Sequence, residues 1–279
     1  MGRRNTAIEL RKARIDAKGL GEQAGADFRF VLCVPGSLWF NLLALSLPMK
    51  PHIKLAETRM PDGARLTLHS HDGSFCIRLD GRDLMHSMTA ASELVLGDLA
   101  TAGLAPGAAP RILIGGLGLG FTLKRVLEKT GARAVVHVAE LMPEVVEWNR
   151  THLAGLNGTL LKDSRVKILV EDVGVVLARA VREPYDAILL DVDNGPAAMV
   201  LPGNTRLYDQ RGLQRLCAAL KPAGRVAIWS AGPDRAFARR FAQAGFTVEV
   251  VPARLHANSK SSSYVIFVGD RLPPPSLAR

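Results

Sequence analysis

The stretch Arg111-Ile112-Leu113-Ile114-Gly115-Gly116-Leu117-Gly118-Leu119-Gly120 decides the fold of this chain. A short apolar run ends abruptly in glycine, and this pattern predicts a buried parallel strand followed by a tight turn. Helix-forming residues from Phe121 to Lys129 then predict a helix that begins directly after the turn. Where a strand, a glycine turn and a helix N-terminus follow one another, the backbone can approach a nucleotide closely.

An acid at the end of the next predicted strand strengthens the nucleotide interpretation. The run Val135-Val136-His137-Val138-Ala139 leads into Glu140, and a carboxylate at this place can accept hydrogen bonds from both hydroxyls of a ribose. The glycines alone are a weak signal, because many α/β proteins use glycine only to pack a helix closely. A pure packing role for the turn is therefore the alternative.

The spacing of the glycines separates the classes of cofactor. Gly116, Gly118 and Gly120 follow the pattern G-x-G-x-G, whereas the dinucleotide fingerprint G-x-G-x-x-G needs a glycine where Phe121 stands. The Gly-Lys-Ser/Thr of a P-loop is absent from the sequence as well. We therefore expect a nucleoside without a pyrophosphate, of the S-adenosylmethionine type, and no metal.

Composition limits the class of protein. The chain has 279 residues, of which 48% are hydrophobic, and a net charge of +10. This suits a packed α/β domain with a smaller addition. Residues 1–50 contribute +4 of the charge, and no cluster of aromatic and basic residues accompanies the rest, so nucleic acid is not an expected partner. Three widely spaced cysteines predict neither a disulfide framework nor a zinc site, and they fit a reducing, cytoplasmic location.

The first 48 residues allow three interpretations. A basic, polar stretch precedes an apolar run at 31–47, which Pro35 and Gly36 interrupt. We favour a true start at Met49, because an organised pattern begins only there. A membrane anchor at 28–48 and a disordered arm are the alternatives, although the apolar run is short for a membrane span.

The rest of the chain predicts a β unit and then a larger α/β domain. Arg65–His69 and Phe75–Leu79 alternate with period two around His71-Asp72-Gly73, which is a hairpin signal. Asp80 to Met85 are expected to lead into a helix near 89–102. The expected domains are a basic and apolar extension (1–48), a small N-terminal β unit plus helix (49–105), a nucleoside-binding domain (106–270) and a disordered tail (271–279).

Beyond residue 110, predicted strands alternate with predicted helices, which implies a parallel sheet with helices on both faces. The last two strands, Phe246–Val251 and Tyr264–Val268, have no helix between them and predict an antiparallel hairpin at one edge. The predicted fold class is α/β: a doubly wound, mostly parallel, seven-stranded Rossmann-like sheet with a small N-terminal antiparallel β unit. The strands are expected near 111–115, 134–139, 166–170, 186–191, 225–230, 246–251 and 263–269. The helices are expected near 119–130, 143–154, 173–182, 206–220 and 233–244.

Acids follow three of these strands at their carboxyl ends, where such sheets bind ligands. Glu140 ends the second strand, Asp172 follows the third, and Asp191 ends the fourth with Asp193 just beyond it. Asp172 is placed to accept a hydrogen bond from an adenine amino group. Asp191 and Asp193 would face the part of the cofactor where chemistry happens, and their charge suits a sulfonium or a protonated amine. The alternative is that both residues only cap a loop.

These residues resemble the spermidine synthase family, aminopropyltransferases that bind decarboxylated S-adenosylmethionine on a class I methyltransferase-type fold. The resemblance runs from about Asp72 to Gly269. It rests on the N-terminal β unit, Leu79-Asp80-Gly81, the glycine turn, Glu140, Asp172, Leu190-Asp191 with Gly195-Pro196-Ala197, and Leu207-Tyr208.

The resemblance implies a role for each matching residue. Glu140 would hold the ribose, Asp172 and Val173 the adenine, and Asp191 would deprotonate the attacking amine; Tyr208 would line the pocket. It also implies a small-molecule amine acceptor and a homodimer built partly through the β unit. The predicted cofactor-binding residues are Gly115, Gly116, Gly118, Gly120, Glu140, Leu141, Asp172, Val173, Asp191 and Tyr208, and the predicted catalytic residues are Asp191 and Asp193.

The chain departs from the family at the polyamine end of the site. Gly118 stands where the family usually has the aspartate that holds the aminopropyl amine. Asp191-Val192-Asp193-Asn194 is one residue shorter than the usual Asp-x-x-Asp-Pro, and Leu84-Met85 replace a glutamine. Three hypotheses follow: an aminopropyltransferase with Asp191 as the base, a methyltransferase that uses intact S-adenosylmethionine on another small molecule, and a non-catalytic nucleoside-binding protein.

Overall fold

The computed structural model describes residues 51–192, 195–196, 205–254 and 264–273. All of these residues belong to one compact unit, Met49–Arg279. The expectations for residues 1–48, for Asp193 and for most of the tail lie outside the described residues. Within the described part, none of the helices combines the length and the apolar character that crossing a membrane requires.

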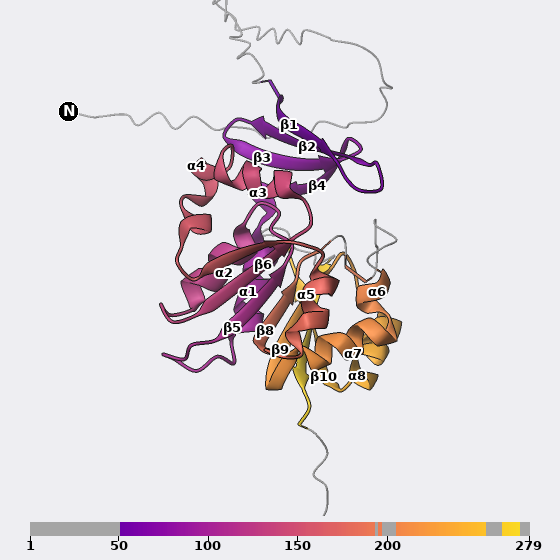
Figure 1. Cartoon of the computed structure of the whole chain (residues 1–279). Helices are drawn as coiled ribbons and strands as arrows, with labels where there is room; N and C mark the ends of the chain where they lie inside the picture. Colours follow the sequence, from indigo (N-terminus) through magenta and orange to yellow (C-terminus); the bar gives the residue numbers. More distant parts are fainter. Residues whose placement is uncertain (1–50, 193–194, 197–204, 255–263, 274–279) are drawn as a thin grey trace, which may run out of the picture. The chain divides into compact units, whose positions relative to one another are not determined.

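The larger layer is a seven-stranded mixed sheet, which confirms the predicted fold class (Figure 1). Five neighbouring strands are parallel to one another, and β11 runs antiparallel to both β9 and β10 toward the other edge, as the missing helix predicted. In spatial order the strands are β10 (Phe246–Ala253), β11 (Tyr264–Arg271), β9 (Leu220–Ser230), β8 (Tyr185–Leu190), β5 (Arg111–Gly115), β6 (Val135–Glu140) and β7 (Val166–Val170).

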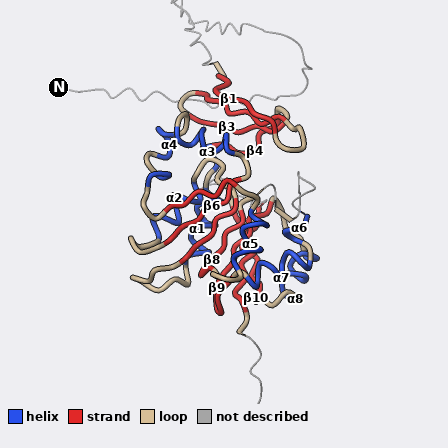
Figure 2. The backbone as a smooth tube through the Cα atoms, in the orientation of Figure 1, coloured by secondary structure: helices blue, strands red, loops and turns tan. Residues whose placement is uncertain are grey.

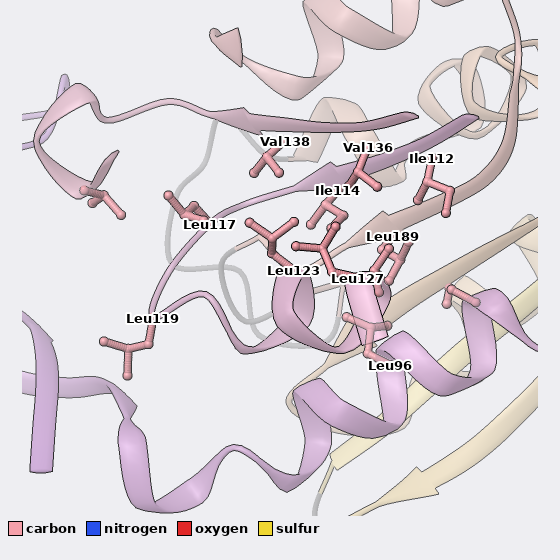
Figure 3. Close-up of a cluster of buried hydrophobic side chains, with 14 of the residues drawn as sticks. Leu96, Ile112, Ile114, Leu117, Leu119, Leu123, Leu127, Val136, Val138 and Leu189 are labelled. Atoms are coloured by element: carbon pink, nitrogen blue, oxygen red, sulfur yellow. The ribbon is translucent and has the colours of Figure 1, made fainter. Parts of the chain in front are cut away.

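Helices cover both faces of this sheet because its strands are apolar on both sides. Ile112 and Ile114 of β5 pack with one group of helices, and Leu113 between them packs with the other. Figure 3 shows the first of these clusters, with Leu96, Leu123 and Leu189 among its buried side chains. The first face carries α1 (Ala91–Thr101), α2 (Phe121–Lys129) and α3 (Pro143–Arg150), and the second carries α5 (Val173–Ala180), α7 (Gln210–Ala218) and α8 (Arg235–Gln243).

Two predicted helices are each divided in the structure. The helix expected near 143–154 ends at Arg150 and is followed by the short α4 (Ala154–Asn157). The helix expected near 206–220 consists of α6 (Thr205–Tyr208) and α7, because Asp209 caps α7 by accepting a hydrogen bond from the Gly212 backbone.

The N-terminal unit is a four-stranded antiparallel sheet, distinguishable from the larger sheet in Figure 2. Its strands are β1 (Ile53–Arg59), β2 (Arg65–His71), β3 (Ser74–Leu79) and β4 (Arg82–His86). The strand β4 was not predicted; the helix expected near 89–102 follows it as α1. Asp80 and Gly81 both have positive φ, 47° and 82°, as Asp72 and Gly73 do, so each Asp-Gly pair makes a two-residue hairpin turn.

Candidate nucleoside-binding site

A pocket opens at the carboxyl edge of the larger sheet, where the predicted ligand crevice lies. Residues that follow four neighbouring parallel strands, β8, β5, β6 and β7, line one side of it. Apolar side chains of the N-terminal sheet, together with Met60 in the turn between β1 and β2, form another wall. The lining residues are Met60, Leu66, Ile77, Leu79, Leu84, Met85, Gly116, Gly118, Ala139, Glu140, Leu141, Met142, Val145, Glu171, Asp172, Val173, Asp191 and Val192.

The glycine turn is held between the ends of two strands. The Gly116 backbone N–H donates to the Ala139 carbonyl at 2.8 Å, and the Asp191 N–H donates to the Gly115 carbonyl at 2.9 Å. Gly116 has a φ of 90°, and a Cβ there would lie 2.3 Å from the Asp191 carbonyl oxygen. Only glycine fits this position, so the backbone itself forms the pocket wall.

The side chain of Glu140, the last residue of β6, binds backbone N–H groups of the glycine turn and of the segment that follows β6. Its Oε2 accepts a hydrogen bond from the Leu117 N–H at 2.8 Å, and its Oε1 accepts one from the Met142 N–H at 2.9 Å. Burial raises the pKa of this carboxyl, while the backbone donors, Met142 first, lower it. Each oxygen keeps a further lone pair, so the carboxylate is fixed in place and still able to accept from a ligand.

The residues after β7 form the second polar part of the pocket. Asp172 caps α5, because its Oδ1 accepts hydrogen bonds from the Gly174 and Val175 N–H groups. Its Oδ2 has no donor among the described residues and is left for a ligand. Val173 is buried beside it, and Leu141 is an exposed lining residue. The capping role and a ligand role for Asp172 are therefore compatible.

Asp191 lies directly after β8, half-buried at the pocket wall. Thr122, in the first turn of α2, donates a hydrogen bond from Oγ1 to Asp191 Oδ2 at 2.7 Å. Burial raises the pKa of Asp191 to about 6, and the Thr122 hydrogen bond lowers it. A carboxyl with this pKa is ionised at pH 7 and still basic enough to take a proton.

Met85 occupies the space next to Gly118. A Cβ built on Gly118 would lie 2.6 Å from Met85 Sδ and 2.8 Å from its Cε. The position where the resembling family carries an aspartate therefore faces a thioether. The described residues that line the pocket include no Lys or Arg, so no basic side chain among them neutralises its carboxylates.

The remaining predicted site residues stand apart from the pocket lining. Gly115 packs tightly against Val173, and Gly120, at a φ of 84°, begins α2. Tyr208 is not among the described residues that line the pocket; its ring is buried 5.8 Å from that of Phe237, under the second face of the sheet. Within the described ranges, no three His, Cys, Asp or Glu side chains gather as metal ligands.

Two buried amides support the turn from the side of α3 and α4. Asn149 Nδ2 donates to the Gly118 carbonyl at 2.8 Å, and Asn157 Nδ2 donates to the Leu119 carbonyl at 2.7 Å and to Asn149 Oδ1 at 2.8 Å. Both residues are buried. The conformation of the turn is thus set before any ligand binds.

Asn157→Asp is expected to destabilise the protein by about 2 kcal/mol, because a carboxylate would replace the amide donor that faces two acceptor oxygens. Urea denaturation measures the change. Glu147→Gln, on the exposed surface of α3, is the matched control and should alter stability by less than about 0.5 kcal/mol. An Asn157→Asp protein as stable as the wild type would show that the amide does not hold the turn.

Sequence reasoning missed three residues of this region: Thr122, Met85 and Glu93. Thr122 was hidden inside an ordinary helix, and Met85 inside an expected helix entry that is a strand. Glu93 carried a topological signal, since α1 ends shortly before β5 begins and its first turn must therefore lie at the carboxyl edge of the sheet.

No protein-family model matches the chain. Among solved structures, it is similar to a spermidine synthase in complex with the transition state analogue AdoDATO, at 20% identity and a TM-score of 0.62, covering 78% of this chain and 73% of that one. It is also similar to spermidine synthase from Thermotoga maritima (20% identity, TM-score 0.60, 78% and 72% covered) and to a probable spermidine synthase from Corynebacterium glutamicum ATCC 13032 (17%, 0.55, 78% and 79%). The chain has the fold of these proteins, in agreement with the predicted resemblance.

Proposed function

We propose that this protein is a transferase of the aminopropyltransferase type, which binds a nucleoside sulfonium and transfers its alkyl group to an amine. The observation that carries the proposal is Asp191, a half-buried carboxyl at the pocket wall with its pKa raised to about 6. The similarity in fold to spermidine synthases supports the same reaction class.

The two ends of the pocket would divide the work. Glu140 would hold the ribose hydroxyls, and Asp172 Oδ2 would accept from the adenine amino group. This orientation directs the sulfonium toward Asp191. Decarboxylated S-adenosylmethionine and S-adenosylmethionine both carry the adenine, ribose and sulfonium that this arrangement would bind.

The chemistry needs one proton acceptor and good alignment. The amine nitrogen attacks the carbon next to the sulfonium; the new C–N bond forms as the C–S bond breaks, and sulfur keeps the electron pair. The extra proton on nitrogen passes to Asp191. Holding nitrogen, carbon and sulfur in line supplies most of the rate enhancement, because no strong nucleophile has to be generated.

Titration calorimetry of the full chain with the two nucleosides, followed by mass spectrometry of products from a panel of amines, tests the proposal. We expect binding of the decarboxylated form and an alkylated amine. Binding without any product would favour a non-catalytic nucleoside-binding protein. Binding of neither ligand would contradict the proposal.

Methyl transfer from intact S-adenosylmethionine is the second candidate, and the contact between Gly118 and Met85 favours it. The pocket wall at this point offers a thioether rather than the carboxylate that would hold an aminopropyl ammonium. A preference for the intact form, with transfer of a labelled methyl group, would support this alternative.

The double variant Gly118→Asp/Met85→Ala tests the importance of this contact. Asp tolerates the φ of 50° at residue 118, and removal of the Met85 side chain clears the space for it. We expect affinity for decarboxylated S-adenosylmethionine to rise about tenfold relative to the intact form, the effect of one charge-assisted hydrogen bond. Met85→Ala alone is the control and should leave the ratio unchanged; an unchanged ratio in the double variant would mean that residue 118 does not face the donor's tail.

A further inference from the structure

The first turn of α1, which carries Glu93, lies at the carboxyl edge of the sheet, where Asp191 follows β8. Glu93 stands one turn before Leu96 on the same face of α1, and Asp191 stands two residues after Leu189. Leu96 and Leu189 are buried together with Leu123, as Figure 3 shows. Because α1 packs against β8, the two carboxyl groups are expected above these leucines, near enough for the charge of Asp191 to act on Glu93.

The electrostatics agree with this placement. Burial, and next the charge of Asp191, raise the pKa of Glu93 to about 7. One hydroxyl serves each group: Ser92 Oγ donates to Glu93 Oε2 at 2.6 Å, as Thr122 does to Asp191. The structure therefore keeps two repelling carboxyls together.

No cation in the described part of the chain compensates these two groups. Two basic residues of the packed helix α2, Arg125 and Lys129, form ion pairs with Asp98 instead. A half-buried pair of like charges is relieved either by a proton, which the raised pKa of Glu93 reflects, or by a cation that joins the pair. The arrangement is therefore that of a site for a positively charged group from outside the chain.

We propose that Glu93 is the second carboxylate of the acceptor site, and that Glu93 and Asp191 together hold the ammonium nitrogen of the incoming amine. This inference rests on the proposed function, since it names what recognises the acceptor in the same site. The ammonium gives one proton to the ionised pair, which frees the lone pair for attack; after the C–N bond forms, the second proton passes to the other carboxylate. A neutral alcohol gains nothing from the pair and is rejected.

The test compares matched acid-to-amide variants on one helix. Full-length protein saturated with 5′-methylthioadenosine is titrated with butylamine, 1,4-diaminobutane and 1-butanol. Glu93→Gln is expected to weaken binding of both amines about tenfold or more, with the nucleoside affinity within twofold of the wild type. Asp98→Asn, whose partners are Arg125 and Lys129, should change neither affinity. Unchanged amine binding in Glu93→Gln, or no amine binding by the wild type, would overturn the proposal.

An infrared titration of the ligand-free protein separates this inference from the proposed function. Asp191→Asn should lower the pKa of Glu93, because the neighbouring negative charge is removed. An unchanged pKa of Glu93 would show that the carboxyls do not face each other, irrespective of whether the protein binds a nucleoside. A coupled pair that binds amines in a protein that binds no nucleoside would support the pair and contradict the proposed function.

Discussion

Asp191→Asn is expected to lower kcat by about 10²–10⁴-fold, the usual contribution of a general base. The asparagine keeps the size of the side chain, and its oxygen can still accept the hydrogen bond from Thr122. Nucleoside affinity, measured by calorimetry, should therefore stay within a few-fold of the wild type. Turnover at the wild-type rate would exclude Asp191 as the base.

The pH dependence of the same reaction follows from the raised pKa of Asp191, about 6. The base acts in its ionised form, so kcat should rise as pH increases through about 6 and level off above about 7, where Glu93 is ionised as well. In the Asp191→Asn protein this limb of the profile should be absent. A residual rate with an unaltered profile would assign the limb to another group.

Glu140→Gln is expected to weaken nucleoside binding by about 3 kcal/mol, roughly a hundredfold, through loss of charge-assisted hydrogen bonds to the ribose. The glutamine also turns an amide donor toward a backbone donor, the N–H of Leu117 or of Met142. A lower melting temperature should accompany the loss of affinity, and circular dichroism at the assay temperature establishes that the variant is folded.

A ligand that lacks the ribose hydroxyls provides the control for Glu140. The wild type should prefer 5′-methylthioadenosine over its 2′,3′-dideoxy analogue, and Glu140→Gln should bind the two alike. If the variant keeps the wild-type preference, another residue recognises the ribose and the role of Glu140 is confined to the turn.

Much of the fold was predictable because its signals are local. The positions of the parallel strands along the chain follow from apolar runs that end in glycine or acid. The edge hairpin follows from a missing helix between Phe246 and Tyr264. The strand β4 was not predicted, because Asp80-Gly81 was interpreted as part of a family motif instead of as a hairpin turn. The same Asp-Gly signal had been interpreted correctly at residues 72 and 73.

The site was predictable only where it depends on the sheet. Glu140, Asp172 and Asp191 line the pocket because the topology of a parallel sheet brings strand ends to one edge. Met85 and Glu93 come from elements that pack onto that edge, and their placement depends on side-chain contacts that no spacing encodes. Tyr208 was expected at the pocket by analogy alone, and its ring instead packs in the core with Phe237.

The backbone contact between Gly115 and Asp191 has a thermodynamic consequence. The backbone N–H of Asp191, whose carboxyl would accept the proton, donates a hydrogen bond to the Gly115 carbonyl in the turn that would bind the nucleoside. Occupancy of the site and ionisation of the carboxyl are therefore linked reciprocally. A sulfonium donor is positively charged and binds more tightly to the ionised carboxyl, whereas the thioether left after transfer is neutral. The affinity for the donor should then increase with pH, while the affinity for the thioether product stays level. Ionisation of one carboxyl would therefore favour binding of the donor over binding of the product.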